Sequence, residues 1–234
     1  MANLVIEVDT LIVGAGVIGS SVAMHLAKLQ GGMGANVRVV DFDLEGVFSS
    51  SELNAGGVRA TWNQAINIES SRISIEYFAS VAQEVGYRPC GYLWLHRPES
   101  FDRAVAACDR TRAHGWEVQA MDVEALKRHA PFIDKTEDLA GAFFAPRDGL
   151  INPNLLKKHY REEARRSGVV FDDATLVKRV DYAAKPGGFA WVKCQRFDRA
   201  IPMHAKGDVM AGRETGLARS TVEYRARRLV NCAG

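Results

Sequence analysis

Residues 9–19 read D-T-L-I-V-G-A-G-V-I-G, and this stretch decides the fold. A short apolar run precedes three glycines, Gly14, Gly16 and Gly19, and helix-forming residues follow them to about Leu29. In a strand–turn–helix loop the first glycine permits a tight turn and the second lets a phosphate approach the backbone. The third lets the helix pack close to the sheet. The stretch therefore predicts a strand, a helix, and an anion-binding turn at the N-terminus of that helix.

An acidic residue stands where such a loop requires one. The apolar run 37–40 predicts a second strand, and Asp41 ends it about 20 positions after the last glycine. A carboxylate there accepts hydrogen bonds from the hydroxyls of a ribose, and the strand–helix–strand order is typical of a parallel sheet. These features together predict a dinucleotide site. Asp43 takes the acidic role if the strand runs two residues longer, and a purely structural glycine turn is the alternative interpretation.

The composition indicates a globular protein with a hydrophobic core. The chain has 234 residues, of which 47% are hydrophobic, and 30 basic against 28 acidic residues leave a formal net charge of +2. This balance gives no electrostatic case for a nucleic-acid partner. The basic clusters at 157–166 and 225–228 are interpreted as solvated faces. The apolar segment 11–26 is too short and too rich in glycine for a membrane span.

The cysteine and histidine patterns exclude two further classes of site. Four cysteines lie far apart and form no C-x-x-C pair, and six histidines form no H-E-x-x-H motif. We therefore expect neither a metal site nor a disulfide framework, and a reducing compartment, the cytoplasm, fits best. No pattern of a secretory signal precedes the first predicted strand.

A second glycine-rich loop follows the acidic residue. Residues 48–59 read F-S-S-S-E-L-N-A-G-G-V-R, which places hydroxyl and amide groups beside a pair of glycines. Such a loop suits close backbone approach to a flat, polar ligand. A flexible surface loop is the alternative interpretation.

The remaining sequence predicts two sets of elements. Periodicity and capping residues indicate helices at 64–84 and 99–114, a short helix capped by Asp122, and a helix that begins at Asn152-Pro153 and ends at Ser167. Strands are expected at 91–96, at 143–144, at 169–171 and near 228–232. Residues 184–219 are the part that is hardest to assign, and within them the stretch from Lys193 to Ser220 shows no steady period and is interpreted as a long hairpin excursion in a β-meander.

The two glycine loops and the strand-end acid resemble the FAD-dependent amine oxidoreductases of the D-amino-acid oxidase superfamily. The resemblance is to the branch of glycine oxidase, sarcosine oxidase and dimethylglycine dehydrogenase. A G-Y-L strand at 91–93, a D-G-x-x-[DN]-P turn at 148–153 and the terminal L-V-N-C-A-G strand are similar to the same family.

The resemblance implies an α/β architecture. A three-layer, Rossmann-like FAD-binding domain, with a parallel sheet plus a β-meander, is expected from residues 1–85 and 150–234. Residues 86–149 are expected to form part of an inserted, incomplete α+β substrate domain. The resemblance covers only the N-terminal portion of such an enzyme, so the rest of that domain is expected beyond residue 234. A fragment of this kind is expected to be inactive alone.

The resemblance also implies which residues contact FAD. Several relatives attach the flavin covalently through a histidine in the loop at 48–59, where this chain has none, so non-covalent FAD is expected. The backbone of Val177 is expected against the adenine, with a plain β-core role as the alternative. The expected FAD-binding residues are Val13, Gly14, Gly16, Val17, Ile18, Gly19, Asp41, Phe42, Ser50, Ser51, Asn54, Ala55, Gly56, Gly57, Val177, Cys232, Ala233 and Gly234.

The activity implied is oxidation of the C–N bond of a small amino acid or N-methylated amine. The substrate's α C–H passes as hydride to flavin N5, and oxygen or an electron carrier takes the electrons onward. Candidate catalytic residues are Arg59, Tyr92 and His96. Arg59 suits a bidentate contact with a carboxylate or a flavin edge, with a surface arginine as the alternative. For Tyr92 and His96 the alternative interpretation is a structural role, in which the side chain packs against its neighbours.

Two other functions remain open from the residues alone. An NAD-binding Rossmann dehydrogenase explains residues 14–41 equally well, but explains neither the second glycine loop nor the terminal strand. A non-catalytic flavoprotein that acts as an assembly or interaction partner is the other alternative.

Overall fold

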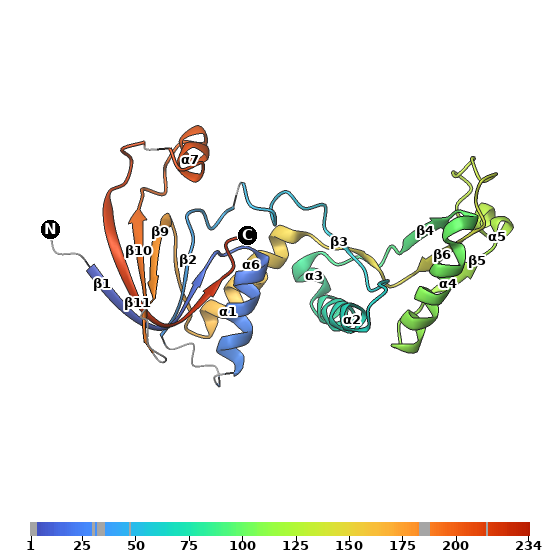
Figure 1. Ribbon diagram of the computed structural model, residues 1–234, viewed down its shortest axis with the longest axis horizontal. Coiled ribbons are helices and arrows are strands. Elements are labelled where there is room, and N and C mark those ends of the chain that lie inside the picture. The colour runs from blue at the N-terminus through green and yellow to red at the C-terminus, as the bar shows by residue number, and fades with distance from the viewer. Residues whose placement is uncertain (1–3, 30, 32–35, 47, 183–187, 214) are drawn as a thin grey trace. The chain divides into compact units, whose positions relative to one another are not determined.

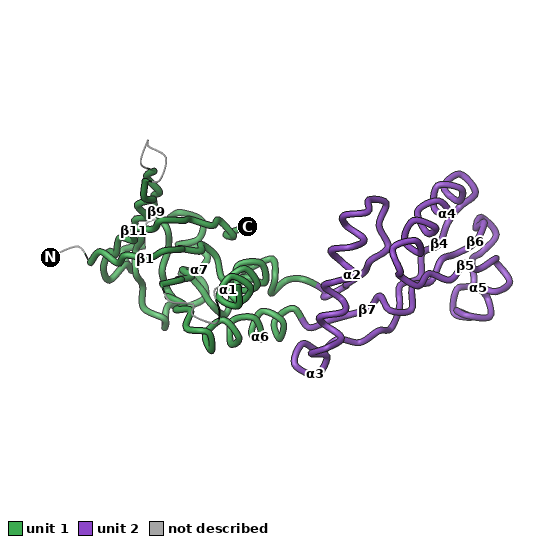
Figure 2. The backbone as a smooth tube through the Cα atoms, turned by 90° about the horizontal axis from the view of Figure 1, so that it is seen from below, with its two compact units in different colours: residues 1–54, 153–234 green, residues 55–152 purple. Residues whose placement is uncertain are grey.

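The computed structural model describes residues 4–29, 31, 36–46, 48–182, 188–213 and 215–234 (Figure 1). The chain forms two compact units (Figure 2). Unit 1 comprises Met1–Asn54 and Pro153–Gly234, and unit 2 comprises Ala55–Asn152. Unit 2 begins earlier in the sequence than the predicted substrate domain, because the helices before residue 86 belong to it. The functional division between residues 85 and 86 stays a prediction.

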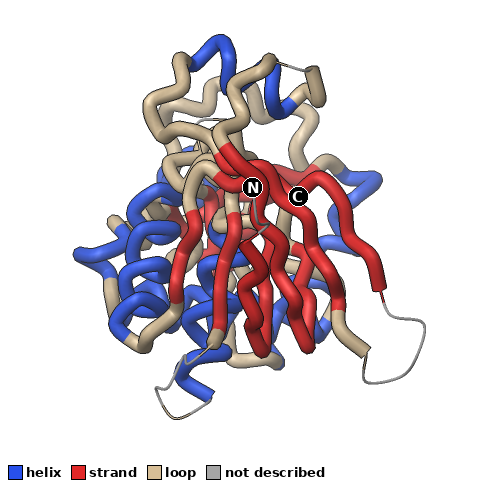
Figure 3. Tube along the Cα trace, turned by 90° about the vertical axis from the view of Figure 1, so that its left-hand side faces the viewer, coloured by secondary structure: helices blue, strands red, loops and turns tan. Residues whose placement is uncertain are grey.

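Unit 1 is built on a six-stranded sheet in the order β8-β2-β1-β11-β10-β9 (Figure 3). The four strands β8, β2, β1 and β11 run parallel to one another. At the other edge, β10 pairs antiparallel with both β11 and β9 and forms a meander with them. The predicted parallel pairing beside the first strand is confirmed, since Leu11 lies opposite Arg38 and Val13 opposite Val40. The strand bounds are β1 Leu4–Val13, β2 Val37–Val40, β8 Val170–Asp172, β9 Thr175–Tyr182, β10 Ala190–Arg196 and β11 Ser220–Asn231.

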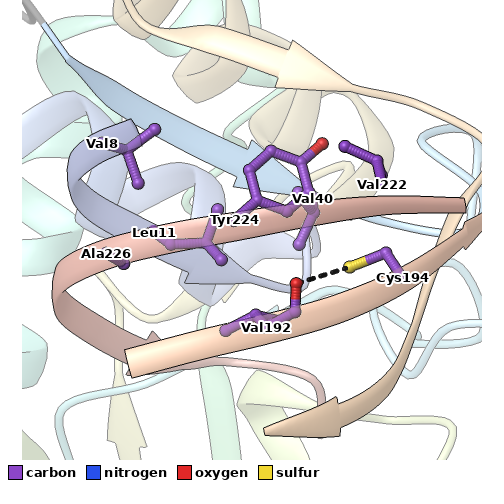
Figure 4. Packing of buried hydrophobic residues seen from close by; sticks show 8 residues of the cluster. All are labelled: Val8, Leu11, Val40, Val192, Cys194, Val222, Tyr224 and Ala226. Atoms are coloured by element: carbon purple, nitrogen blue, oxygen red, sulfur yellow. Dashed lines mark hydrogen bonds between the residues drawn. The ribbon is translucent and has the colours of Figure 1, made fainter. Parts of the chain in front are cut away.

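Two helices of unit 1 pack against each other, α1 (Val17–Leu29) and α6 (Pro153–Arg166). The helix α1 also contacts β1 and β2 and buries its small residues, Ala23 and Ala27 among them. Eight buried side chains from β1, β2, β10 and β11, the fully buried Tyr224 among them, form one core cluster (Figure 4). Each fully buried aliphatic side chain of such a cluster contributes about 1.5–3 kcal/mol to the folded state.

The connection between β10 and β11 contains a helix that the sequence pattern did not predict. The helix α7 (Met203–Met210) buries only Ala205 and Val209, one helical turn apart. A single apolar pair over eight residues gives too weak a periodic signal for prediction, and tertiary packing decides the conformation. Residue 214, within the predicted excursion, and residues 183–187, before it, lie outside the described part of the chain.

Unit 2 contains a three-stranded antiparallel sheet in the order β4-β6-β5 and a two-stranded pair, β3-β7. The strands are β3 Gly57–Val58, β4 Tyr92–His96, β5 Gln119–Met121, β6 Gly141–Ala145 and β7 Gly149–Leu150. The helices are α2 Ala65–Ser80, α3 Ala82–Val85, α4 Pro98–Ala113 and α5 Val123–His129. The single helix expected at 64–84 is interrupted at Val81, whose φ of −126° is not helical. The predicted cap of α5 is confirmed, because Asp122 Oδ1 accepts a hydrogen bond from Ala125 N at 2.7 Å.

Within the described residues, no helix is both long and apolar enough to cross a membrane.

Candidate functional site

The glycine turn between β1 and α1 is tightly packed at its first and third glycines. Gly14 has a φ of +98°, and a Cβ there would lie 2.3 Å from the carbonyl oxygen of Cys232. A Cβ on Gly19 would lie 1.8 Å from the carbonyl oxygen of Gly14, so α1 packs directly on the turn. Gly16 differs, because a Cβ there would approach only Ser51 Oγ, at 3.1 Å. The first and third glycines thus serve the packing of the turn, and the second leaves its outer side open.

The N-terminus of α1 opens toward the loop that follows β2. Ser51 Oγ accepts a hydrogen bond from Val17 N at 3.0 Å, and Ser20 Oγ donates to Ala15 O at 2.9 Å. The positive end of the helix dipole makes this end favourable for an anion.

Asp41 is held against the glycine turn by two backbone donors. Its Oδ2 accepts from Ala15 N at 2.5 Å, and its Oδ1 accepts from Asp43 N at 2.9 Å. Burial raises the pKa of Asp41, and these hydrogen bonds oppose that effect. Asp43 points elsewhere and forms an ion pair with Lys206 of α7 at 3.1 Å. Of the two acids that the sequence left open, Asp41 is therefore the one that contacts the turn.

Two adjoining cavities of about 290 and 220 Å³ lie at this turn in unit 1. They share Gly14, Asp41 and Met210 among their lining residues. A carboxylate for a ribose, an open Gly16 and an anion-favouring helix end meet here, which fits the adenosine and diphosphate part of a dinucleotide. The predicted residues that line the two cavities are Val13, Gly14, Gly16, Val17, Ile18, Asp41, Phe42, Ser50, Ser51, Val177, Cys232, Ala233 and Gly234.

Five predicted cofactor residues do not line these cavities. Gly19 is buried beneath the turn, and Asn54 is exposed at the end of the first segment of unit 1. The other three, Ala55, Gly56 and Gly57, belong to unit 2. Their contact with FAD stays a prediction.

Sequence reasoning missed several residues of this site. Lys157 of α6 and Met210 of α7 line it from more than 100 positions away, so no local pattern reveals them. The interpretation of residues 157–166 as a solvated face is wrong for two members, because Lys157 is 3% and Arg161 8% exposed. The other missed lining residues are Ala15, Val40, Leu44, Gly46, Phe48, Ser49, Thr175 and Leu176.

The three candidate catalytic residues lie in unit 2, where Arg59 lines one cavity with His96 and a neighbouring cavity with Tyr92. The guanidinium carbon of Arg59 lies 4.2 Å from the ring centre of Trp62 and 4.6 Å from that of Trp94. His96 lines the same cavity of about 400 Å³, and burial lowers its pKa, which favours the neutral ring. Tyr92 lines a neighbouring cavity of about 490 Å³, which Arg59 also borders.

The charge of the cavity that Arg59 and His96 share is positive. Its lining includes Arg59 and Arg103 but no aspartate or glutamate. The Arg59 guanidinium carbon lies over the rings of two indoles, and the N–H edge of a guanidinium matches the geometry of a carboxylate. The cavity is therefore suited to an anionic ligand with an apolar body.

Asp148, from the D-G-x-x-[DN]-P turn, positions the loop that carries Arg59. Its side chain is fully buried and accepts three hydrogen bonds. The donors are Ala60 N at 3.0 Å, Trp116 Nε1 at 2.8 Å and Thr61 Oγ1 at 3.2 Å. Two of these donors directly follow Arg59, so the buried carboxylate fixes the backbone from which Arg59 extends.

The structure places no group of three or more metal-ligating side chains together within the described ranges. All four cysteines are free thiols.

Comparisons with known proteins agree with this geometry. The chain is 30% identical over 175 residues to "FAD-dependent oxidoreductase domain-containing protein 1" of Bos taurus, a match that covers 70% of this chain and 36% of that protein. It is 28% identical over 169 residues to "Dimethylglycine dehydrogenase, mitochondrial" of Rattus norvegicus, covering 69% and 19% respectively. The chain thus matches about a third or less of the length of these relatives.

Solved structures share the fold. The match with L-proline dehydrogenase from P. horikoshii covers 99% of this chain and 54% of the chain of that protein, with a TM-score of 0.73 and 18% identity. Glycine oxidase from Geobacillus kaustophilus matches 97% of this chain and 55% of its own, with a TM-score of 0.68 and 20% identity. The model of the family DAO, described as FAD dependent oxidoreductase, matches residues 9–234. The chain therefore belongs to the DAO family of FAD-dependent oxidoreductases, with FAD as its cofactor.

Proposed function

We propose that this chain serves the oxidation of a C–N bond in a small amino acid or N-methylated amine. The observation that carries the proposal is Arg59, whose guanidinium lies over two indoles and which lines a cavity without acidic residues. A substrate carboxylate is the natural partner of that edge. Amino acids and an N-methylated glycine also stand in the names of the dehydrogenases and the oxidase to which the chain is similar.

Each unit has its own task in this proposal. FAD, when bound, accepts the hydride from the substrate's α C–H. In unit 1 the glycine turn and the N-terminus of α1 bind the diphosphate, Asp41 binds the ribose and the backbone of Val177 contacts the adenine. In unit 2 Arg59 orients the substrate by its carboxylate, and the neutral ring of His96 lets an amine approach without charge repulsion. Oxygen or an electron carrier takes up the electrons.

Anaerobic flavin reduction tests this function. The FAD-loaded protein is mixed with dimethylglycine, sarcosine, glycine or D-proline, and separately with NADH, while flavin absorbance is followed. Bleaching by one of the amines and not by NADH is the expected result. Bleaching by NADH alone would overturn the proposal in favour of a nicotinamide-linked enzyme.

Replacing Arg59 by glutamine is expected to weaken carboxylate binding about tenfold or more, because it removes a charge-assisted bidentate contact. Trp62 and Trp94 flank Arg59, so tryptophan fluorescence reports occupancy of the cavity. Titration with dimethylglycine is compared with titration by trimethylamine, which has no carboxylate. Arg103→Gln, on the same cavity, is the matched control. Equal loss in both variants, or equal response to both amines, would mean that Arg59 does not hold the carboxylate.

Replacing Asp41 by alanine is expected to weaken FAD binding by about 1.5–3 kcal/mol, roughly 10- to 150-fold, because the ribose loses a charged acceptor. Quenching of FAD fluorescence on titration gives the dissociation constants. Asp43→Ala is the control, since Asp43 pairs with Lys206 instead of the turn. If Asp41→Ala binds FAD like the wild type and Asp43→Ala does not, the acidic role belongs to Asp43.

We also propose the cytoplasm as the location, from the unpaired cysteines. Fractionation of cells that express the tagged protein tests this, and recovery with mitochondria would contradict it.

A further inference from the structure

The helix α6 buries two cations against the loop that follows β2. Lys157 and Arg161 are one helical turn apart, and both are almost fully buried. Lys158, their neighbour, is exposed and lies 3.8 Å from Glu162 of its own helix. Burying an ammonium group costs several kcal/mol unless it is well paired, so the burial of Lys157 requires an explanation.

The contacts of the two cations explain how the loop at 44–52 is held. Lys157 Nζ donates to Glu45 O at 2.6 Å and lies 3.3 Å from Glu52 Oε2. Arg161 donates through NH1 to Leu44 O at 2.7 Å, and its NH2 lies 3.7 Å from Glu45. Arg161 thus holds the start of the loop at Leu44 and Glu45.

Lys157 differs from Arg161 because it also lines the cavity at the glycine turn. Its Nζ lies 3.0 Å from the point that a Cβ on Gly46 would occupy, so the ammonium lies close to the backbone of the loop at this glycine. An ammonium has three donors, and the two oxygens of Glu45 and Glu52 use two of them. The serines at 49–51 and the turn residues Gly14 and Gly16 line the same cavity.

Apart from Lys157, the charged residues that line this cavity are the two acids Asp41 and Asp43. Asp41 is held by backbone N–H groups, and Asp43 is paired with Lys206. The backbone donors at the start of α1 favour an anion, but a diphosphate carries two negative charges. Lys157 is the buried side chain of the cavity lining that is able to offset them.

We propose that Lys157 is a further FAD-binding residue, whose ammonium contacts the diphosphate of the cofactor. Glu52 competes for that ammonium, while Arg161 keeps the loop in place. The inference rests on FAD as the cofactor and not on the identity of the substrate. It adds to the glycine turn a cation that comes from α6, more than 130 residues further along the chain.

Binding of FAD, and of ADP and adenosine as parts of FAD, to the full chain tests this inference. Lys157→Met is compared with its matched control Lys158→Met by titration with FAD, ADP and adenosine at low and high salt. For Lys157→Met we expect FAD and ADP to bind about 10- to 100-fold more weakly, with a smaller salt dependence. Adenosine, which has no phosphate, is expected to bind within about twofold of the wild type. Lys157→Arg is expected to restore most of the ADP affinity, and Lys158→Met to leave all three unchanged.

A second variant separates cofactor binding from loop positioning, because Lys157→Met also removes a loop contact. Glu52→Gln keeps the lysine and neutralises its competitor, so ADP is expected to bind about two- to fivefold more tightly. Equal losses of ADP and adenosine affinity in Lys157→Met would overturn the proposal, since they indicate only a displaced loop. Weaker ADP binding in Glu52→Gln would overturn it as well. No amine is used, so these results do not depend on the proposed substrate.

Discussion

Replacing Gly19 by alanine is expected to cost unit 1 about 4 kcal/mol or more, enough to unfold it at ordinary temperature. The new Cβ would lie 1.8 Å from the carbonyl oxygen of Gly14 and 2.9 Å from its carbonyl carbon. Both are backbone atoms of a turn that is itself packed against Cys232, so neither moves cheaply. The helix α1 would have to move away from the sheet, and its packing against α6 would be lost with it.

Urea unfolding followed by far-UV circular dichroism measures this effect. Gly16→Ala is the matched control in the same turn, because its Cβ would meet only the flexible Ser51 Oγ at 3.1 Å. We expect Gly16→Ala to fold. Gly16→Val is expected to fold and to lose FAD, because a larger side chain enters the space of the diphosphate. A wild-type unfolding midpoint for Gly19→Ala would contradict the close contact of α1 with the turn.

Replacing Asp148 by alanine is expected to destabilise unit 2 by about 3–5 kcal/mol. The substitution leaves Ala60 N, Thr61 Oγ1 and Trp116 Nε1 without their common acceptor. Buried donors without partners carry most of this cost. The loop that carries Arg59 would also lose its anchor, so carboxylate binding is expected to weaken together with stability.

Tryptophan fluorescence during urea unfolding follows unit 2, because Trp62, Trp94 and Trp116 all lie there. Asp148→Asn, which keeps one acceptor, is expected to cost less than alanine. Burial raises the pKa of Asp148 above its ordinary 3.8, despite the opposing hydrogen bonds. Its contribution to stability is therefore complete below pH 3.8 and falls as the pH rises through the raised pKa. A loss below about 1 kcal/mol in Asp148→Ala would contradict the anchoring role.

The predictable parts of this protein are those whose physical cause is local. The positive φ of Gly14 and the close contact of Gly19 with Gly14 lie within one turn, and Asp122 and Pro153 mark helix starts by their own capping chemistry. The helix α7 could not be predicted in this way. Its two buried residues gain their stability from tertiary packing, which leaves little periodic pattern in eight residues.

The amino-acid sequence by itself determined the parallel strand pair, the turn and α1, and it placed an acid at the end of β2. Short-range sterics and hydrogen bonding decide these features, so they are encoded in neighbouring residues. Only the tertiary structure decided that Asp41 contacts the turn while Asp43 pairs with Lys206. It also decided that Arg59 is stacked between two indoles and that Lys157 is buried. Burial and pairing depend on residues distant in sequence, and the charge of a side chain alone does not reveal which partner it meets.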